Sequence, residues 1–309
     1  MNVKKHFPIL LAIVLSVLFC YLFYDNYYSI ANKAEYFYVK HLQPDLKQHL
    51  VDNNYKKGAN YSFVKINKNT TISNLNDAQN AIYTFLDSGW KKYTIKCNPD
   101  YLNCTDDVKK MVENNTYLTD ISNFVHPYNT FEKINSSFTS TGRITFKKEI
   151  RYTDSQIKSI NEKVNQIYNE NYDANKDTKG NIKIFHDYII SHTKYDSANT
   201  SGTSDMSSSN SYGVLFDGLG ICSGYTDAMT LFLEKMGLGN IRVSSDTHVW
   251  NLVFIDNIWY HLDLTWDDPI MSDGSNTISY KYFLITDSTL KSLGDNEHNY
   301  DANIYIEAK

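Results

Sequence analysis

The sequence predicts an α+β fold in which a helix that carries a cysteine packs against an antiparallel sheet. Apolar residues recur at helical spacing directly after Cys222, and two segments rich in Val, Ile, Phe, Trp and Tyr flank the turn pair Asp256-Asn257. A third observation is the mixture of helix-like and strand-like patterns between residues 61 and 152. It predicts a smaller α+β domain in front of this core.

Length and charge limit the classes of protein to which the chain can belong. With 309 residues, 42% of them hydrophobic, it can bury one or two cores. A polar break near residue 175 divides an accessory domain at 61–175 from a catalytic domain at 176–309. The net charge of −5 gives no basic surface for a nucleic acid. The bias toward Asn, Lys, Ile and Tyr is typical of an AT-rich bacterial genome.

The N-terminal segment has the pattern of a membrane anchor. Lys4 and Lys5 precede an uncharged apolar run at 7–24, which Asp25 ends. A run of this length is about enough to cross a bilayer, and basic residues in front of it favour a cytoplasmic N-terminus. We therefore expect a cytoplasmic tip and a transmembrane helix within residues 1–25.

Two other interpretations of this segment stay open. A cleaved signal peptide would give a secreted protein, although the match to a cleavage site at 31–34 is poor. A buried core helix is the third interpretation. As an anchor, the segment predicts a single-pass protein of the cell membrane, with a stalk at 26–60 and the bulk of the chain extracellular, at a bacterial cell surface.

The four cysteines fit an oxidising compartment. Cys97 and Cys104 flank a turn-forming stretch, so a local disulfide is expected there. Cys20 lies in the apolar run, which leaves Cys222 as the unpaired thiol. Reactivity explains such a thiol in an exported protein, and burial as a small hydrophobic residue is the plainer explanation.

Hydrophobic periodicity predicts alternating helices and strands before residue 195. The accessory domain shows no catalytic spacing, and its lone His126 precedes a proline, so we expect an accessory or substrate-presenting role. A stretch at 197–211 rich in Ser, Asn, Thr and Gly predicts a mobile surface loop. The expected helices are 76–86 (capped by Asn76 or Asp77), 105–111, 153–171 and 182–189, and the expected strands are 90–96 and 142–152.

Cys222 is predicted to begin a helix. The positive end of a helix dipole and its free backbone N–H groups favour the thiolate, which is the attacking species. One of these N–H groups can also donate to an oxyanion. An apolar helical stripe follows the cysteine and two glycines stop it: Tyr225, Ala228, Met229, Phe232, Leu233 and Met236, then Gly237 and Gly239.

His248 and Asp263 come together if the segments 248–256 and 258–264 form a hairpin. A two-residue turn places the two side chains on one face, diagonal to each other at roughly 7 Å between backbones. A four-residue turn keeps the same register, whereas a turn of odd length would separate them. Strand parity therefore predicts a base beside an orienting carboxylate.

Three sequence blocks together resemble the transglutaminase-like superfamily, which is related to papain. That family shows a Gly-x-Cys-x-Gly-Tyr helix start, a His-x-Trp-Asn strand and an Asp-x-Thr-Trp strand end. The chain has all three in the same order within about 182–286. They are Gly220-Ile221-Cys222-Ser223-Gly224-Tyr225, His248-Val249-Trp250-Asn251 and Asp263-Leu264-Thr265-Trp266.

The resemblance implies Cys222 as the nucleophile, His248 as general base and later acid, and Asp263 as the group that orients the imidazole. The chemistry of the residues supports the same roles. Attack on an amide would release an amine and leave a thioester. Water would hydrolyse the thioester in a protease or isopeptidase, and a second amine would capture it in a cross-linking transglutaminase, an acyltransferase. A catalytically inactive binding or scaffold module is the third alternative.

Two departures from the family pattern concern the substrate site. The short interval between Cys222 and His248 predicts trimmed loops and an open cleft. Eukaryotic transglutaminases use an upstream tryptophan to stabilise the oxyanion, whereas Trp90 of this chain lies in the other domain. The candidate oxyanion or substrate-binding residues are Tyr195, Tyr212, Tyr225 and Trp250, the first two as replacement donors.

The sequence predicts neither a metal nor an organic cofactor. No group of His, Cys and carboxylate residues has metal-ligand spacing, and no Gly-rich phosphate loop follows a strand. His261 lies on the same face of the hairpin as His248, but at a position that does not align with the cysteine. We therefore expect no catalytic role for it. The expected partners are a protein or peptide substrate, such as a cell-wall peptide, and the membrane that holds the anchor.

Overall fold

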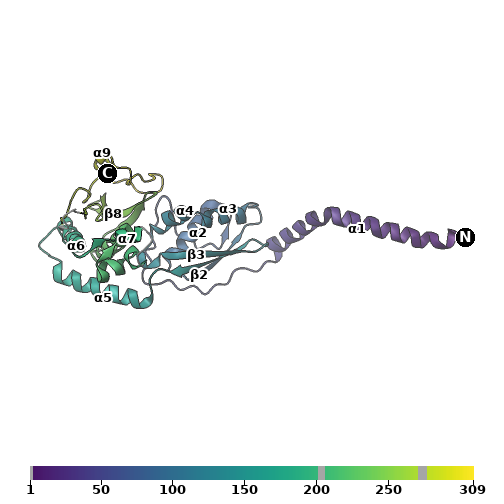
Figure 1. The fold of residues 1–309 in the computed structure, drawn as a ribbon. Helices are drawn as coiled ribbons and strands as arrows, with labels where there is room; N and C mark the ends of the chain where they lie inside the picture. Colours follow the sequence, from purple (N-terminus) through teal and green to yellow (C-terminus); the bar gives the residue numbers. More distant parts are fainter. Residues whose placement is uncertain (1–2, 201–205, 271–276) are drawn as a thin grey trace.

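The chain has a mixed α+β fold, and the computed structural model describes residues 3–200, 206–270 and 277–309 (Figure 1). Helix α1 (Val3–Phe37) and the π-helical turn at Tyr38–Leu42 project from the end of the molecule that carries β2 and β3. The C-terminal elements, with α9, lie at the opposite end.

Helix α1 continues past Asp25, where the predicted transmembrane helix was expected to end. Among the described residues, no single helix is both long and apolar enough to be a candidate membrane span. The segments Leu11–Leu22 and Asn26–Leu42 satisfy the length and composition only as a pair, bent by 59° at their junction.

The accessory unit is a four-stranded sheet, in the order β1-β2-β4-β3, covered by helices. The helices and strands expected near 76–86, 90–96, 105–111 and 142–152 are confirmed. The cap of the first helix was wrongly placed: the side chain of Asn74, not Asn76 or Asp77, accepts the backbone N–H of Asp77 at 2.8 Å. The elements are β1 (Thr71–Ile72), α2 (Leu75–Asp87), β2 (Lys92–Cys97), α3 (Cys104–Glu113), α4 (Asn115–Ser122), β3 (Phe131–Phe138) and β4 (Arg143–Ile150).

The segment expected to be a stalk, residues 26–60, divides into two parts. Its first part belongs to α1 and the π-helical turn. Its second part lies against the accessory sheet, because the amide of Gln48 bonds both the N–H and the carbonyl of Thr94 in β2 at 2.7 Å. Backbone groups that the sheet leaves open are thereby satisfied.

The second unit corresponds to the domain predicted to be catalytic and is called the catalytic unit below. It places helices on a three-stranded antiparallel sheet, in the order β7-β8-β9. Short elements occupy part of the expected mobile loop at 197–211, and its residues 201–205 lie outside the described part of the chain. The larger elements are α5 (Asp154–Asn171), α6 (Thr178–His192), α8 (Cys222–Lys235), β7 (Asn240–Ser244), β8 (Val249–Ile255), β9 (Ile258–Leu262) and α9 (Asp287–Leu293). The short elements are β5 (Lys194–Tyr195), α7 (Ser197–Thr200), a 3-10 turn at Met206–Ser209, a π turn at Gly213–Asp217 and β6 (Leu219–Gly220).

The β8–β9 hairpin has the predicted register. Ile255 pairs with Ile258, so Asp256 and Asn257 form a two-residue loop. Both loop residues have positive φ angles, 50° and 65°, as a type I′ turn requires. The hairpin therefore brings the chain before β8 and the chain after β9 to the same end of the sheet.

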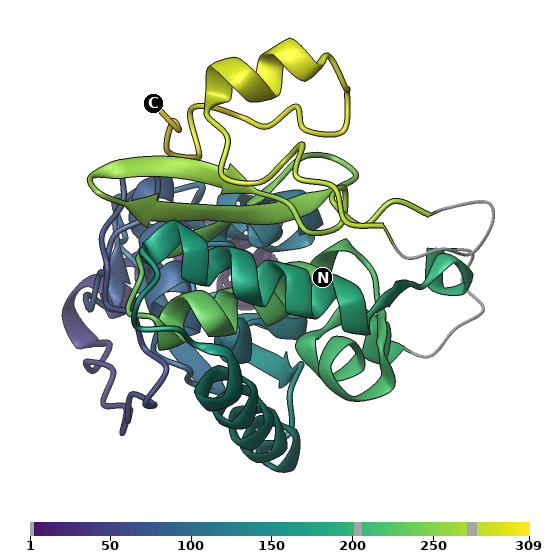
Figure 2. The same ribbon diagram turned by 90° about the vertical axis from the view of Figure 1, so that its left-hand side faces the viewer.

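The two faces of this sheet belong to different hydrophobic cores. Trp250 and Leu252 join the core of the accessory unit, whereas Val253 and Ile255 pack with α5, α6 and α8. Figure 2 shows the yellow C-terminal segment on one side of the strands and the teal and green helices on the other. Helix α5 thus packs with the catalytic unit, although the predicted boundary near residue 175 placed it in the accessory domain.

Candidate active site

Cys222 is the first residue of α8 and is a free thiol. The glycines around it permit close approach, because a Cβ on Gly224 would collide with the carbonyl oxygen of Ser208 and one on Gly220 with the ring of Tyr225. The hydroxyl of Thr226 donates to the carbonyl of Cys222 at 2.7 Å and to that of Val249 at 3.0 Å. This bond ties the first turn of α8 to the residue beside His248.

His248 and Asp263 lie at the ends of the two hairpin strands, one residue before β8 and one after β9. His248 Nε2 lies 2.6 Å from Asp263 Oδ2, and both side chains are buried. The side chain of Cys222 lies close enough to the imidazole to contribute to the raised pKa of His248. The structure therefore brings together the three residues that the sequence predicted as catalytic.

The Asp263 carboxylate is held by its own backbone as well. Its Oδ1 accepts the backbone N–H of Thr265 at 2.8 Å and that of Trp266 at 3.3 Å. An aspartate that bonds the backbone two residues on forms a local turn. The Asp-x-Thr-Trp spacing is thus explained by the turn that orients this carboxylate.

Electrostatics favour a charged imidazole beside a charged carboxylate. Burial disfavours the cation, but the charge and hydrogen bond of Asp263, together with those of Cys222, outweigh it and raise the pKa of His248 to about 10. Burial likewise disfavours the Asp263 anion, but the hydrogen bonds and charges of its histidine partners hold its pKa well below the ordinary range. The site therefore favours an imidazolium at His248 next to a carboxylate at Asp263.

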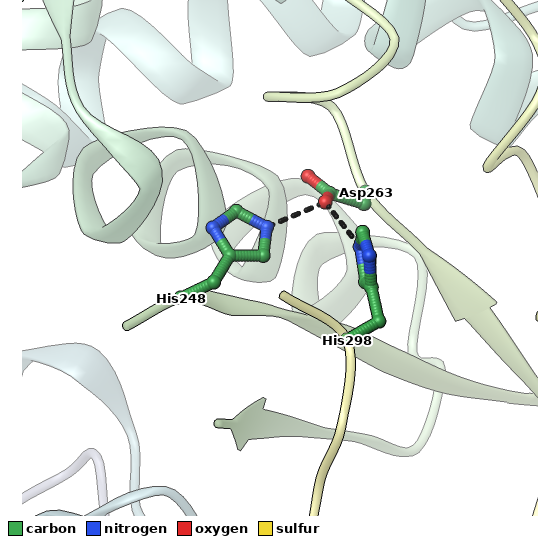
Figure 3. Close-up of side chains that lie close together, drawn as sticks. All are labelled: His248, Asp263 and His298. Atoms are coloured by element: carbon green, nitrogen blue, oxygen red, sulfur yellow. Dashed lines mark hydrogen bonds and ion pairs between the residues drawn. The ribbon is translucent and has the colours of Figure 1, made fainter. Parts of the chain in front are cut away.

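His298 is a residue of this site that the sequence prediction missed (Figure 3). Its Nε2 lies 2.9 Å from Asp263 Oδ2, so the two imidazoles converge on one carboxylate oxygen. It lies in the irregular segment after α9, beyond the three motif blocks. Only the Asp295-x-x-His298 spacing hinted at a paired histidine, and that signal is weak.

The cluster of His248, Asp263 and His298 is best described as a hydrogen-bonded network. Their nitrogen and oxygen atoms lie within 4.8 Å of one another, close enough to suggest a metal site. However, the two histidine nitrogens already face the same carboxylate oxygen at 2.6 and 2.9 Å in a buried setting. These bonds satisfy the facing atoms without an ion.

The four predicted oxyanion or substrate-binding candidates differ in position. Tyr195 is half-buried, pairs through β5 with Gly220, and lies near enough to Cys222 for their charges to interact. Tyr212 is half-buried and stacks on Phe216, with ring centroids 4.6 Å apart.

Tyr225 and Trp250 do not fit the roles predicted for them. The Tyr225 hydroxyl donates to Asp268 Oδ2 at 2.5 Å, so its donor is engaged. Trp250 is wholly buried and cannot contact a substrate; its indole N–H donates to His261 Nδ1 at 2.9 Å. His261 in turn bonds Asp287 at 2.6 Å, in a network behind the site.

Comparisons with known proteins agree with these motifs. Residues 166–264 match the model of the transglutaminase-like superfamily. No curated protein matches the sequence. Similar solved structures include one described as a TGase, which is 14% identical over 49% of this chain and 48% of that chain, with a TM-score of 0.34.

Another is described as a proposed cysteine protease from Cytophaga hutchinsonii, 11% identical over 48% of this chain and 65% of that chain, with a TM-score of 0.28. The matched part spans less than two thirds of either structure. The family assignment therefore depends on the match at residues 166–264.

Proposed function

Residues 166–264 form a domain of the transglutaminase-like superfamily, and on this premise we propose that the chain is a cysteine-dependent amide hydrolase that acts on proteins or peptides through a thioester. Cys222 is the nucleophile, His248 the base and later the acid, and Asp263 the group that orients the imidazole. One observation carries the proposal: the 2.6 Å bond from His248 to Asp263, in an imidazole whose pKa the neighbouring Cys222 side chain also raises.

The reaction follows from the order of these groups. The Cys222 sulfur forms a bond to the amide carbon, and the C–N bond breaks as the leaving amine takes a proton from His248. Water then gives a proton to His248 and attacks the thioester carbon, which releases the acid and restores the thiolate. The first backbone N–H groups of α8 are suited to stabilise the oxyanion, and Tyr195 is the second candidate donor.

Thiol reactivity tests whether the site is active. In a Cys20→Ala background of the full-length protein, iodoacetamide labels Cys222 alone, because Cys97 and Cys104 form a disulfide. We expect fast labelling near pH 6 to 7 that is lost in His248→Ala. Labelling only at a pH near the pKa of an ordinary thiol, about 8.5, would instead identify a scaffold or binding module.

A labelled primary amine separates hydrolysis from cross-linking. The thioester is common to both reactions, so we would supply the amine together with a mixture of candidate surface proteins. We expect new peptide ends in wild type and none in Cys222→Ala. Incorporation of the amine without new peptide ends would identify the protein as a cross-linking transglutaminase and not a hydrolase.

We further propose that the apolar run at 7–24, the first part of α1, anchors the protein in the cell membrane with the catalytic unit outside. The apolar run at 7–24 behind Lys4 and Lys5 supports this, as does the disulfide between Cys97 and Cys104. Protease added to intact cells should degrade the catalytic unit. Protection of that unit until the cells are broken would contradict the proposed orientation, and recovery in the medium would indicate cleavage of the segment.

A further inference from the structure

His298 joins the candidate triad to a second carboxylate. Its Nε2 faces Asp263 at 2.9 Å and its Nδ1 faces Asp295 Oδ1 at 2.7 Å. The same Asp295 oxygen accepts the backbone N–H of His298 at 3.0 Å. Four side chains therefore form one line of contacts, His248, Asp263, His298 and Asp295, and Cys222 acts electrostatically on the first of them.

We propose that His298 is a positioning residue for the reaction: held by Asp295, it fixes the Asp263 carboxylate so that His248 stays directed at Cys222. This role rests on the proposed function of Cys222 and adds to it a group that the three family motifs do not contain. His298 does not touch the reacting atoms and acts only through Asp263.

The hydrogen bonds of Asp263 show what His298 contributes. Two backbone N–H groups hold one carboxylate oxygen, and the imidazoles of His248 and His298 share the other. Without His298, the shared oxygen of a buried carboxylate would have only His248 as a partner, a ring whose charge changes during the reaction. His298 is a partner that does not take part in the proton transfer, so the carboxylate keeps its position throughout.

The ring of His298 is itself fixed on several sides. It stacks on Tyr282 with centroids 4.7 Å apart, and the edges of Trp250 and Trp266 meet it at 4.8 and 5.1 Å. The Tyr282 hydroxyl donates to the second oxygen of Asp295 at 3.1 Å. A histidine with both nitrogens bonded and its faces packed has one orientation, which suits a positioning role.

The two acceptors of His298 support the same interpretation of the geometry. Its ring nitrogens face carboxylate oxygens of Asp263 and Asp295, so the ring is held at both ends. The titratable groups that surround His298 are Asp263, Asp295, His248, His261 and Tyr282.

The test compares variants of the full-length Cys20→Ala protein by the pH profile of iodoacetamide labelling at Cys222. His298→Ala removes the donor, His298→Gln keeps an N–H near the position of Nε2, and Asp295→Asn weakens the support of the ring. His126→Gln is the matched control, since His126 is equally buried (6% against 5% exposed) and bonds the carboxylate of Glu234 at 2.8 Å.

We expect His298→Ala to slow labelling near pH 7 by roughly ten- to a hundredfold, the effect of losing one hydrogen bond to a charged group. His298→Gln should recover part of the rate. The acid limb of the profile should move to higher pH in both variants, because a displaced Asp263 stabilises the His248 imidazolium less, and the imidazolium in turn favours the reactive thiolate less. His126→Gln should leave both the rate and the limb unchanged.

The outcomes separate this role from the proposed function. Slow labelling of the parent protein would overturn both. Fast labelling that is lost in His248→Ala, but equal in rate and pH profile for parent, His298→Gln and Asp295→Asn, would overturn the positioning role alone. A lower melting temperature with an unchanged profile would show that His298 is only structural. If the histidine variants fail to fold, Asp295→Asn decides.

Discussion

At the scale of single residues, His248 should make stability depend on pH. Its folded pKa of about 10 lies above the ordinary value of 6.5. Its protonation therefore stabilises the fold fully below about pH 6.5, and this contribution is lost as the pH rises toward 10. In a Cys222→Ala background, where Asp263 is the remaining partner, the difference in unfolding free energy between parent and His248→Gln should shrink over this window.

His126 provides a control of opposite sign for this measurement. Burial lowers its pKa more than Glu234 raises it, so the fold loses stability as His126 is forced to charge at low pH. The difference between parent and His126→Gln should therefore shrink as the pH falls through about 6.5. Urea unfolding at several pH values measures both differences in unfolding free energy. If the two differences changed with pH in the same direction, the raised pKa assigned to His248 would be contradicted.

The sequence was sufficient for the candidate triad because its parts depend on local rules. The helix start after Gly220 places Cys222, and the parity of a short hairpin places His248 against Asp263. His298 could not be predicted in this way. It lies 35 residues beyond Asp263, in a segment without periodicity, and only tertiary packing brings it to the shared carboxylate.

At the scale of elements, the β8–β9 turn should control the stability of the site. Asn257 has a φ of 65°, which costs an ordinary residue about 1 kcal/mol. Asn257→Ala should thus lower the free energy of unfolding by about that amount, whereas Asn257→Gly should leave it equal or slightly higher. Denaturant curves of the two full-length variants provide the measurement, and equal losses in both would show that the turn conformation is not the cause.

The disulfide should stabilise the accessory unit without affecting thiol chemistry. It joins the end of β2 to the start of α3, at the end of the molecule from which α1 projects (Figure 1). Replacing Cys97 and Cys104 by serine should cost about 2 kcal/mol, as expected for a short loop. The labelling rate of Cys222 should not change. A slower rate, with Cys20→Ala as the control, would reveal a coupling between the loop and the site.

Elements with strong local signals were predictable, and those defined by tertiary contacts were not. Helix α5 has a full capping box, in which Thr153 and Gln156 bond each other's backbone N–H groups, and its start was predicted at that residue. Strand β3, by contrast, lies at the edge of its sheet with half of its residues exposed and none fully buried, so it lacks the apolar alternation that identifies a strand. The segment after α1 was taken for a stalk because polar side chains, not apolar ones, hold it to the sheet.

At the scale of the whole molecule, the two units are joined through the C-terminal segment. Tyr305 is buried, and its hydroxyl donates to Asp120 of α4 at 2.7 Å. The same oxygen lies 2.9 Å from the hydroxyl of Ser244 in β7 and accepts the side-chain amide of Asn123 at 2.8 Å. Because Trp250 and Leu252 of β8 also share the accessory core, the units should unfold together.

Removal of one hydroxyl tests this coupling. Burial raises the pKa of Asp120, and the bonds from Tyr305 and Ser244 oppose that rise, so Tyr305→Phe leaves a buried carboxylate short of a donor. We expect a loss of about 1–3 kcal/mol in unfolding free energy. Hydrogen exchange in denaturant should show both units losing protection in one transition, shifted to lower denaturant. Tyr172→Phe, at an exposed tyrosine, should leave the transition in place. Two separate transitions in the parent protein would mean that the shared core does not couple the accessory unit to the site.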